Sequence, residues 1–206
     1  PGIEVDENYM KACLARRAPS MTTDIARREN DEFRILSGVF SGKTTGTPIC
    51  IIVPNENQRS KDYEYGIARP AHADFSANQK YHGFEDYRGG GHFSGRVTAG
   101  IVAGGAILQK ALQDIGVTVA THISECAELH DKAFDDIKSD RLNLDCAKFP
   151  VLDEDVASGM IKAIEQAKAD GDSVGGIVET AISGIPSGVG EPWFDSVEGV
   201  LSHALF

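Results

Sequence analysis

The segment 59–96 concentrates side chains that can bind an anion and give it a proton. It holds three of the chain's six histidines, His72, His82 and His92, together with four arginines and two lysines. Three consecutive glycines, at positions 89–91, directly precede a stretch with the pattern of a helix, and backbone N–H groups at a helix N-terminus bind anions. A solvated loop has little physical reason to combine these features, so the segment predicts a pocket for an anionic ligand.

His72 is the candidate acid of this segment. It follows Arg69 closely and lies between two alanines, so its ring is sterically open to a ligand. An imidazole titrates near neutral pH and is suited to donating a proton to a leaving group. Asp74 is a possible orienting partner of the ring, or a structural partner of Lys80 instead. An ordinary core or surface histidine is the competing interpretation.

The sequence GGGHFSGR, residues 89–96, adds hydrogen-bond donors after the glycines. His92, Ser94 and Arg96 can join the backbone N–H groups in binding a phosphate or a carboxylate. A plain glycine loop that is capped by Ser94 is the competing interpretation. We favour the binding interpretation because basic residues lie on both sides of the loop.

Three motifs earlier in the chain bear on anion binding. The pairs Arg16–Arg17 and Arg27–Arg28 are weaker candidates, since most such pairs are solvated, although guanidinium groups do bind phosphate through two parallel hydrogen bonds. The stretch SGKTTGT looks like the end of a nucleotide-binding P-loop, but that motif needs a glycine where Ser37 stands. Pro48 also interrupts the helix that should follow. We therefore interpret SGKTTGT as a hairpin turn.

Length and composition exclude several classes of protein. The chain has 206 residues, of which 41% are hydrophobic, which is typical of an ordinary globular protein with one substantial core or two small ones. No apolar run approaches the roughly 20 residues that span a bilayer, and the first residues lack the features of a signal peptide. The net charge is −11, and residues 97–206 carry 18 acidic against 7 basic groups. Nucleic-acid binding wants a broad basic face, so neither nucleic acid nor membrane is an expected partner.

The four cysteines have no C-x-x-C spacing, so we expect no zinc or other metal site. Cys50 lies in the apolar run PICIIV and is expected to be a small buried hydrophobe. Without a secretion signal, reduced thiols in the cytoplasm are the expectation.

Apolar periodicity and capping residues predict an α+β fold with sheet layers around helices. The helix 96–115 is expected deep in the core, with Val97, Ile101, Leu108 and Leu112 on one face and its interior glycines packed closely against a neighbouring backbone. The other expected elements are a helix 6–16 capped by Asp6, strands 33–40 and 48–53, a strand 117–123, a short helix within 125–150, a helix that starts at Asp153 or Asp155 and ends at Gly171, a strand 173–182 and a helix from 193.

Six stretches of the chain resemble the chorismate synthase family. They cover nearly all of the sequence in the order of the family: LSGVFSGKTTGTPI, NQRSKDY, RPAHADF, KYHGFEDYRGGGHFSGRVTAG, GDSVGGIVE and SGIPSGVGEPWFD. The resemblance implies a lyase of the shikimate pathway, which leads to aromatic amino acids. It implies a 1,4-anti elimination of phosphate from 5-enolpyruvylshikimate 3-phosphate to give chorismate, with reduced FMN as the cofactor. It also implies a β-α-β sandwich fold, a small phosphorylated molecule as the partner and a homotetramer.

The resemblance assigns roles to individual residues. His72 matches the family histidine that acts as an acid near the leaving phosphate. The residues that match substrate-binding positions are Arg16, Arg17, Arg69, Ser94, Gly95 and Arg96, and the implied flavin-binding residues are His92, Phe93 and Ser94.

This sequence departs from the family pattern in several places. The common GGGRSSAR is GGGHFSGR here, so His92 and Phe93 replace an arginine and a serine, and RRRPG becomes ARRAPS. The GESHG motif with the other catalytic histidine, and the family's C-terminal flavin contacts, are not in the sequence. We therefore expect residues 1–206 to be one domain, incomplete at both ends, that does not turn over substrate alone. The alternative is a non-catalytic fragment or relative that binds a phosphorylated ligand.

Overall fold

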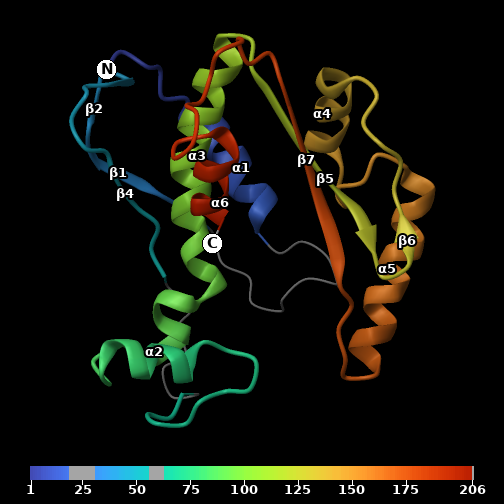
Figure 1. Cartoon of the computed structure of the whole chain (residues 1–206). Coiled ribbons are helices and arrows are strands. Elements are labelled where there is room, and N and C mark those ends of the chain that lie inside the picture. The colour runs from blue at the N-terminus through green and yellow to red at the C-terminus, as the bar shows by residue number, and fades with distance from the viewer. Residues whose placement is uncertain (19–30, 56–62, 206) are drawn as a thin grey trace. The chain divides into compact units, whose positions relative to one another are not determined.

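The computed structural model describes residues 1–18, 31–55 and 63–205. Helices and strands are interspersed along the chain without a regular alternation (Figure 1). The α+β class that the sequence predicts is confirmed. The chain divides into two units, Pro1–Ala111 and Leu112–Phe206. No helix among the described residues is both long and apolar enough to cross a membrane.

Unit 1 is built on two helices. The α1 helix, Glu7–Arg17, begins where the Asp6 carboxylate accepts hydrogen bonds of 2.9 Å from the backbone N–H groups of Asn8 and Tyr9. This is the predicted cap. Met10, Cys13 and Leu14 of α1 pack in one apolar cluster with four residues of the α3 helix, Thr98–Asp114, and these are Ala99, Ala103, Ala106 and Ile107.

The expected packing of α3 is wrong in one respect. The predicted apolar face is exposed, with 72% of Ile101 and 61% of Leu108 accessible to solvent, and the alanine face is buried instead. Small side chains on that face let α1 approach closely, which larger side chains would prevent. Gly100 and Gly104 have open space where a Cβ would lie, so close packing of the glycines is also not observed.

Short antiparallel strands follow α1 in unit 1. The strands β1, Arg34–Ser37, and β4, Cys50–Ile52, pair with each other, and β2, Val39–Phe40, pairs with β3, Lys43–Thr44. The predicted strand 33–40 is thus present but interrupted at Gly38, and the predicted hairpin turn at SGKTTGT is confirmed. Cys50 is exposed, contrary to expectation, because Ile51 is the β4 residue that faces the core.

The segment between β4 and α3 is helical in three short pieces. They are α2, Asp74–Tyr81, and the 3-10 helices η2, Arg88–Phe93, and η3, Gly95–Val97. The sequence does not predict α2, which buries Ala77 and has no side-chain cap. The three glycines lie inside η2, and η3 separates them from α3. The sequence analysis expected these glycines at the N-terminus of the long helix, and that expectation is wrong.

Unit 2 contains an antiparallel sheet with the strand order β6-β5-β7. Its strands are β5, Thr118–Cys126, β6, Leu129–His130, and β7, Gly176–Ser183. The helices α4, Ile137–Cys146, α5, Glu154–Ala169, and α6, Val197–Leu205, complete the unit. Asp153 caps α5 as predicted, and the fully buried Met160 of α5 packs against Cys126 and Val151.

Candidate functional site

Arg69, His72 and Asp74 form a compact cluster, which we call the histidine cluster. The Asp74 carboxylate accepts hydrogen bonds from the backbone N–H of Arg69 at 3.0 Å, from its Nε at 2.8 Å and from its Nη2 at 2.9 Å. The other contact of this carboxylate is with Nδ1 of His72, 2.7 Å from Oδ1. The histidine cluster is possible because α2 begins at Asp74 and Ala71 turns the chain with a positive φ of 57°. The three side chains thereby come from six consecutive residues.

The electrostatics of the histidine cluster keep Arg69 and Asp74 charged. Hydrogen bonds from Arg69 hold the pKa of the Asp74 carboxyl well below its usual range, against the opposing effect of burial. The same hydrogen bond raises the pKa of Arg69. An ionised Asp74 requires Nδ1 of His72 to be the donor, since a carboxylate can only accept. Nε2 of His72 then accepts a hydrogen bond of 3.2 Å from Nη2 of Arg69, so a ligand that reaches this nitrogen must replace that contact.

Arg17 and Arg96 form a second cluster around Asp31, which we call the arginine cluster. The Asp31 side chain is 3% exposed, and its Oδ2 lies 2.7 Å from Nη1 of Arg17. Its Oδ1 is in close contact with Nη1 of Arg96. Arg17 also donates to the carbonyl of Gly95 at 3.2 Å. The structure therefore brings together three predicted substrate-binding residues, and it adds an aspartate that the sequence analysis missed.

The other predicted residues make contacts of their own or lie outside the described part of the chain. Ser94 accepts a hydrogen bond of 3.2 Å from the backbone N–H of Arg96 and so caps η3, which matches the plainer interpretation of this serine. Arg16 is exposed and donates to the Sγ atom of Cys13 over 3.8 Å. Arg27 and Arg28, and also Arg59 and Lys61, lie outside the described residues.

His92 and Phe93 stand next to Tyr81 of α2. The ring centroids of Tyr81 and His92 are 5.8 Å apart, and those of Tyr81 and Phe93 are 6.5 Å apart. Phe93 is 42% exposed. A cavity of about 30 Å³ is lined by both residues and by Asp74, so GGGHFSGR and RPAHAD meet there.

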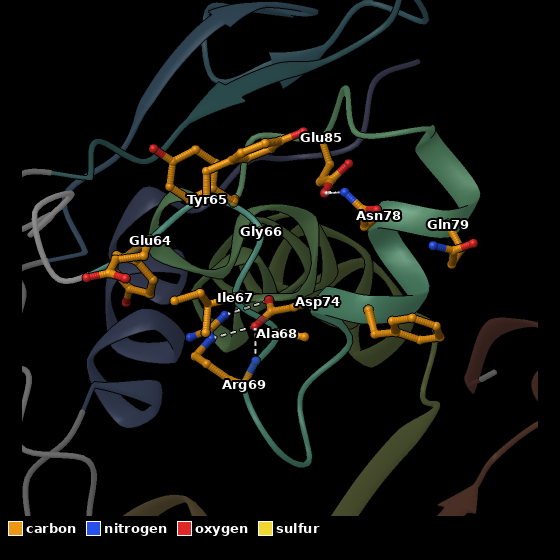
Figure 2. A pocket seen from close by; sticks show the side chains of 13 residues that line it. Glu64, Tyr65, Gly66, Ile67, Ala68, Arg69, Asp74, Asn78, Gln79 and Glu85 are labelled. Carbon is orange, nitrogen blue, oxygen red and sulfur yellow. Dashed lines mark hydrogen bonds and ion pairs between the residues drawn. The ribbon is translucent and has the colours of Figure 1, made fainter.

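A cavity of unit 1 opens beside the histidine cluster (Figure 2). It has a volume of about 610 Å³ and is lined by residues 63–69, by the first turns of α2 and by Glu85 and Tyr87. Figure 2 shows Arg69 and Asp74 joined at one side of this pocket, with Tyr65 and Glu85 across from them. Of the predicted site residues in the described part of the chain, Arg69 lines the pocket. Its aromatic residues are Tyr63, Tyr65, Phe75 and Tyr87, and the sequence analysis assigned none of them to a site.

Tyr63 contacts the histidine cluster directly. The guanidinium carbon of Arg69 lies 5.1 Å from the centroid of the Tyr63 ring, within the range of a cation–π interaction. Within residues 1–18, 31–55 and 63–205, no group of His, Cys, Asp and Glu side chains is arranged to hold a metal ion.

Comparisons with known proteins identify relatives of the whole chain. A family model described as chorismate synthase matches residues 1–206. Curated proteins named chorismate synthase from Cytophaga hutchinsonii and Thermococcus gammatolerans are 42% and 41% identical over all of this chain and 57% of their own lengths. A solved structure titled as a crystal structure of chorismate synthase matches 99% of this chain and 57% of that chain, with a TM-score of 0.75 at 24% identity. The described chain thus has the fold of that structure and spans a little over half the length of the relatives it matches.

Proposed function

The chain belongs to the chorismate synthase family, and from this we propose that it carries part of a site that eliminates phosphate from 5-enolpyruvylshikimate 3-phosphate to form chorismate. The observation that carries the proposal is the position of His72 between an arginine and an ionised aspartate. Such an arrangement can hold a phosphate and protonate it at the same place.

His72 is proposed as the acid that protonates the leaving group. In a 1,4-elimination the C–O bond to phosphate breaks, its electron pair leaves with the phosphate oxygen, and a proton leaves the substrate carbon at the other end of the allylic system. A departing phosphate that takes up a proton leaves more readily. Nε2 of His72 would give that proton, and the contact of Nδ1 with the Asp74 carboxylate orients the ring.

Arg69 is proposed to bind the phosphate that departs. Its Nη2 lies 3.2 Å from Nε2 of His72, so an anion that accepts from one of these groups is within reach of the other. Asp74 and the Tyr63 ring hold the guanidinium in place, which reduces the entropy lost on binding. The arginine cluster and Arg16 are proposed to bind the carboxylates of the substrate.

Reduced FMN is the proposed cofactor, and when bound it would lend electron density to the allylic system of the substrate and accept the proton that leaves the substrate carbon. His92, Phe93 and Ser94 are the residues proposed to hold it. The support is that the exposed rings of His92 and Phe93 lie beside the partly buried ring of Tyr81. The expectations of a tetramer, of a cytoplasmic location, of one domain incomplete at both ends and of no turnover by this chain alone stay predictions.

Ligand titrations test the proposal. We expect the chain to bind 5-enolpyruvylshikimate 3-phosphate in calorimetry, and we expect Arg69→Ala to weaken this binding about tenfold or more, since a charge-assisted hydrogen bond contributes about 1.5–3 kcal/mol. Arg34→Ala, which removes an exposed arginine of β1, is the matched control and should leave the affinity within about twofold. Equal affinities of the wild-type chain and Arg69→Ala would remove Arg69 from the site.

An anaerobic assay tests turnover. The chain is incubated with reduced FMN and substrate, and chorismate is followed by its absorbance. Formation at the rate of a complete family member would contradict the expectation that this chain does not work alone. Quenching of FMN fluorescence, with and without substrate, separates a partial site from a chain that binds neither ligand.

A further inference from the structure

We propose that Asp31 is a positioning residue that holds Arg17 and Arg96 together as one binding site for an anionic group of the substrate. The proposal rests on the function proposed above, and it adds a residue that neither motif nor family resemblance points to. Asp31 does not touch the ligand in this proposal. It acts through the two arginines.

The geometry shows one carboxylate shared by two guanidinium groups. Oδ2 of Asp31 binds Arg17 and Oδ1 binds Arg96, while the Asp31 side chain is only 3% exposed. The two arginine side chains are 19% and 21% exposed, so each keeps a part that solvent, and hence a ligand, can reach. The carboxylate is thus more deeply buried than the two arginine side chains that it joins.

Further contacts fix the orientation of both guanidinium groups. Nε of Arg17 donates to the hydroxyl of Thr98 at 3.2 Å, and Nη2 of Arg96 donates to the carbonyl of Pro54 at 3.0 Å. The partners lie at the end of α1, after β4 and at the start of α3. Segments that are far apart in the sequence of unit 1 therefore hold the two arginines in place around Asp31 before a ligand arrives.

The charges explain why a carboxylate is needed here. Two guanidinium groups that point at one spot repel each other, and without a counter-charge they would move apart. With Asp31 between them, the two arginines and the carboxylate together carry a net charge of +1, which still attracts an anion. An uncharged side chain at position 31 would raise the positive charge but would no longer hold the geometry.

These two effects predict opposite results for Asp31→Asn, and this makes the proposal testable. If Asp31 only neutralised the arginines, its removal would strengthen anion binding. If Asp31 positions them, its removal weakens binding. The two guanidinium groups then separate and gain conformational freedom, and ligand binding must remove this freedom at a cost in entropy. A purely structural role would lower stability and leave the affinity of the folded protein unchanged.

Calorimetric titration with 5-enolpyruvylshikimate 3-phosphate decides between the neutralising, positioning and structural roles of Asp31. We expect Asp31→Asn to weaken binding about tenfold, the effect of one charge-assisted hydrogen bond. In an Arg96→Met background the same substitution should change affinity by less than about threefold, because the shared geometry is already lost. Asp145→Asn, which removes one negative charge from a partly buried ion pair of the other unit, is the control and should bind as the wild-type chain does.

Each outcome bears on the proposal. Unchanged or tighter binding by a folded Asp31→Asn variant, as judged by circular dichroism, overturns it while leaving the proposed function in place. Absence of binding by the wild-type chain overturns both. If Asp31→Asn does not fold, Arg96→Lys gives the same test, since lysine keeps the charge but cannot contact Asp31 and the Pro54 carbonyl together. Wild-type affinity in that variant would likewise overturn the proposal.

Discussion

Replacement of Asp131 by asparagine should destabilise unit 2 strongly. The Asp131 and His122 side chains are both fully buried, and Oδ2 of Asp131 accepts from the backbone N–H of Leu152 at 2.6 Å and lies 2.6 Å from Nδ1 of His122. Its Oδ1 accepts from the backbone N–H groups of Asp153 and Lys132, both at 2.9 Å. Four donors thus converge on one carboxylate, which ties β5 to the chain segments that lead into α4 and α5.

The magnitude follows from the chemistry of the asparagine amide. It has one oxygen and one NH2 group. With the NH2 group at the Oδ1 position, the backbone N–H groups of Asp153 and Lys132 would face a donor. With the NH2 group at the Oδ2 position, the backbone N–H of Leu152 would face a donor, and Nδ1 of His122 could accept only in the tautomer that donates from Nε2 to Glu179. A buried donor that loses its acceptor costs about 1–3 kcal/mol. Together with the loss of the buried charge beside His122, we expect the free energy of unfolding to fall by about 3–5 kcal/mol. That is a large part of the total stability of a domain of ordinary size.

Urea unfolding followed by circular dichroism measures this change, and hydrogen exchange of the β5 amides locates it in unit 2. Asp145→Asn is the control, because its carboxylate is 31% exposed and pairs with Arg141 within one helix. Its cost should stay within about 0.5 kcal/mol. A loss of less than about 1 kcal/mol for Asp131→Asn would show that water replaces the acceptor easily, and the reasoning from burial would then be wrong.

Two further predictions concern pH and backbone strain. Burial alone would raise the pKa of Asp131, but hydrogen bonds from Leu152, His122 and Asp153 lower it below its ordinary value of 3.8. Its stabilising effect is therefore complete above that value and is lost as the pH falls through the lowered pKa, so urea midpoints should drop below about pH 4 and drop less in Asp131→Asn. Gly38→Ala should lower stability by about 1–3 kcal/mol in thermal unfolding, because φ is +83° and a Cβ would lie 2.7 Å from the Cα of Ile49. The control Gly100→Ala, where a Cβ meets nothing within 4 Å, should stabilise α3 by up to about 1 kcal/mol.

The elements that the sequence predicts best are those with local signals. Asp6 and Asp153 mark the starts of α1 and α5 because a capping carboxylate acts on N–H groups two or three residues away. The α2 helix lacks such a signal. Its N-cap is Ala73, without a side-chain hydrogen bond, and it buries little more than Ala77, so neither capping nor apolar periodicity shows it.

The face of α3 that is buried could not be read from apolar residues alone. Ile101 and Leu108 suggest one face by their size, yet Ala99, Ala103 and Ala106 are the residues that contact α1. The decision depends on how closely another helix approaches, which is a property of the tertiary structure. Hydrophobic periodicity gives a helix and a possible face, but it does not distinguish a face of small residues that packs from a face of large ones that does not.

The same division between local and distant partners applies to the candidate site. The histidine cluster comes from RPAHAD, so sequence reasoning could propose that Asp74 orients His72. The arginine cluster joins residues that lie 14 and 65 positions from Asp31, and no motif connects them. An acidic residue in an ordinary acidic stretch carries no mark that it will be buried between two arginines.

Both clusters pair the arginines assigned to the substrate with carboxylates. Arg69 has Asp74, and Arg17 and Arg96 share Asp31. Apart from His72 and Arg16, the five side chains of the two clusters carry a net charge of only +1, so in the proposed site these clusters supply little net charge for a substrate with three anionic groups. Affinity must come from hydrogen-bond donors that are held in place before the ligand arrives, since a fixed donor loses little entropy on binding. This is why the carboxylates, rather than additional arginines, are the residues whose removal tests the site most directly.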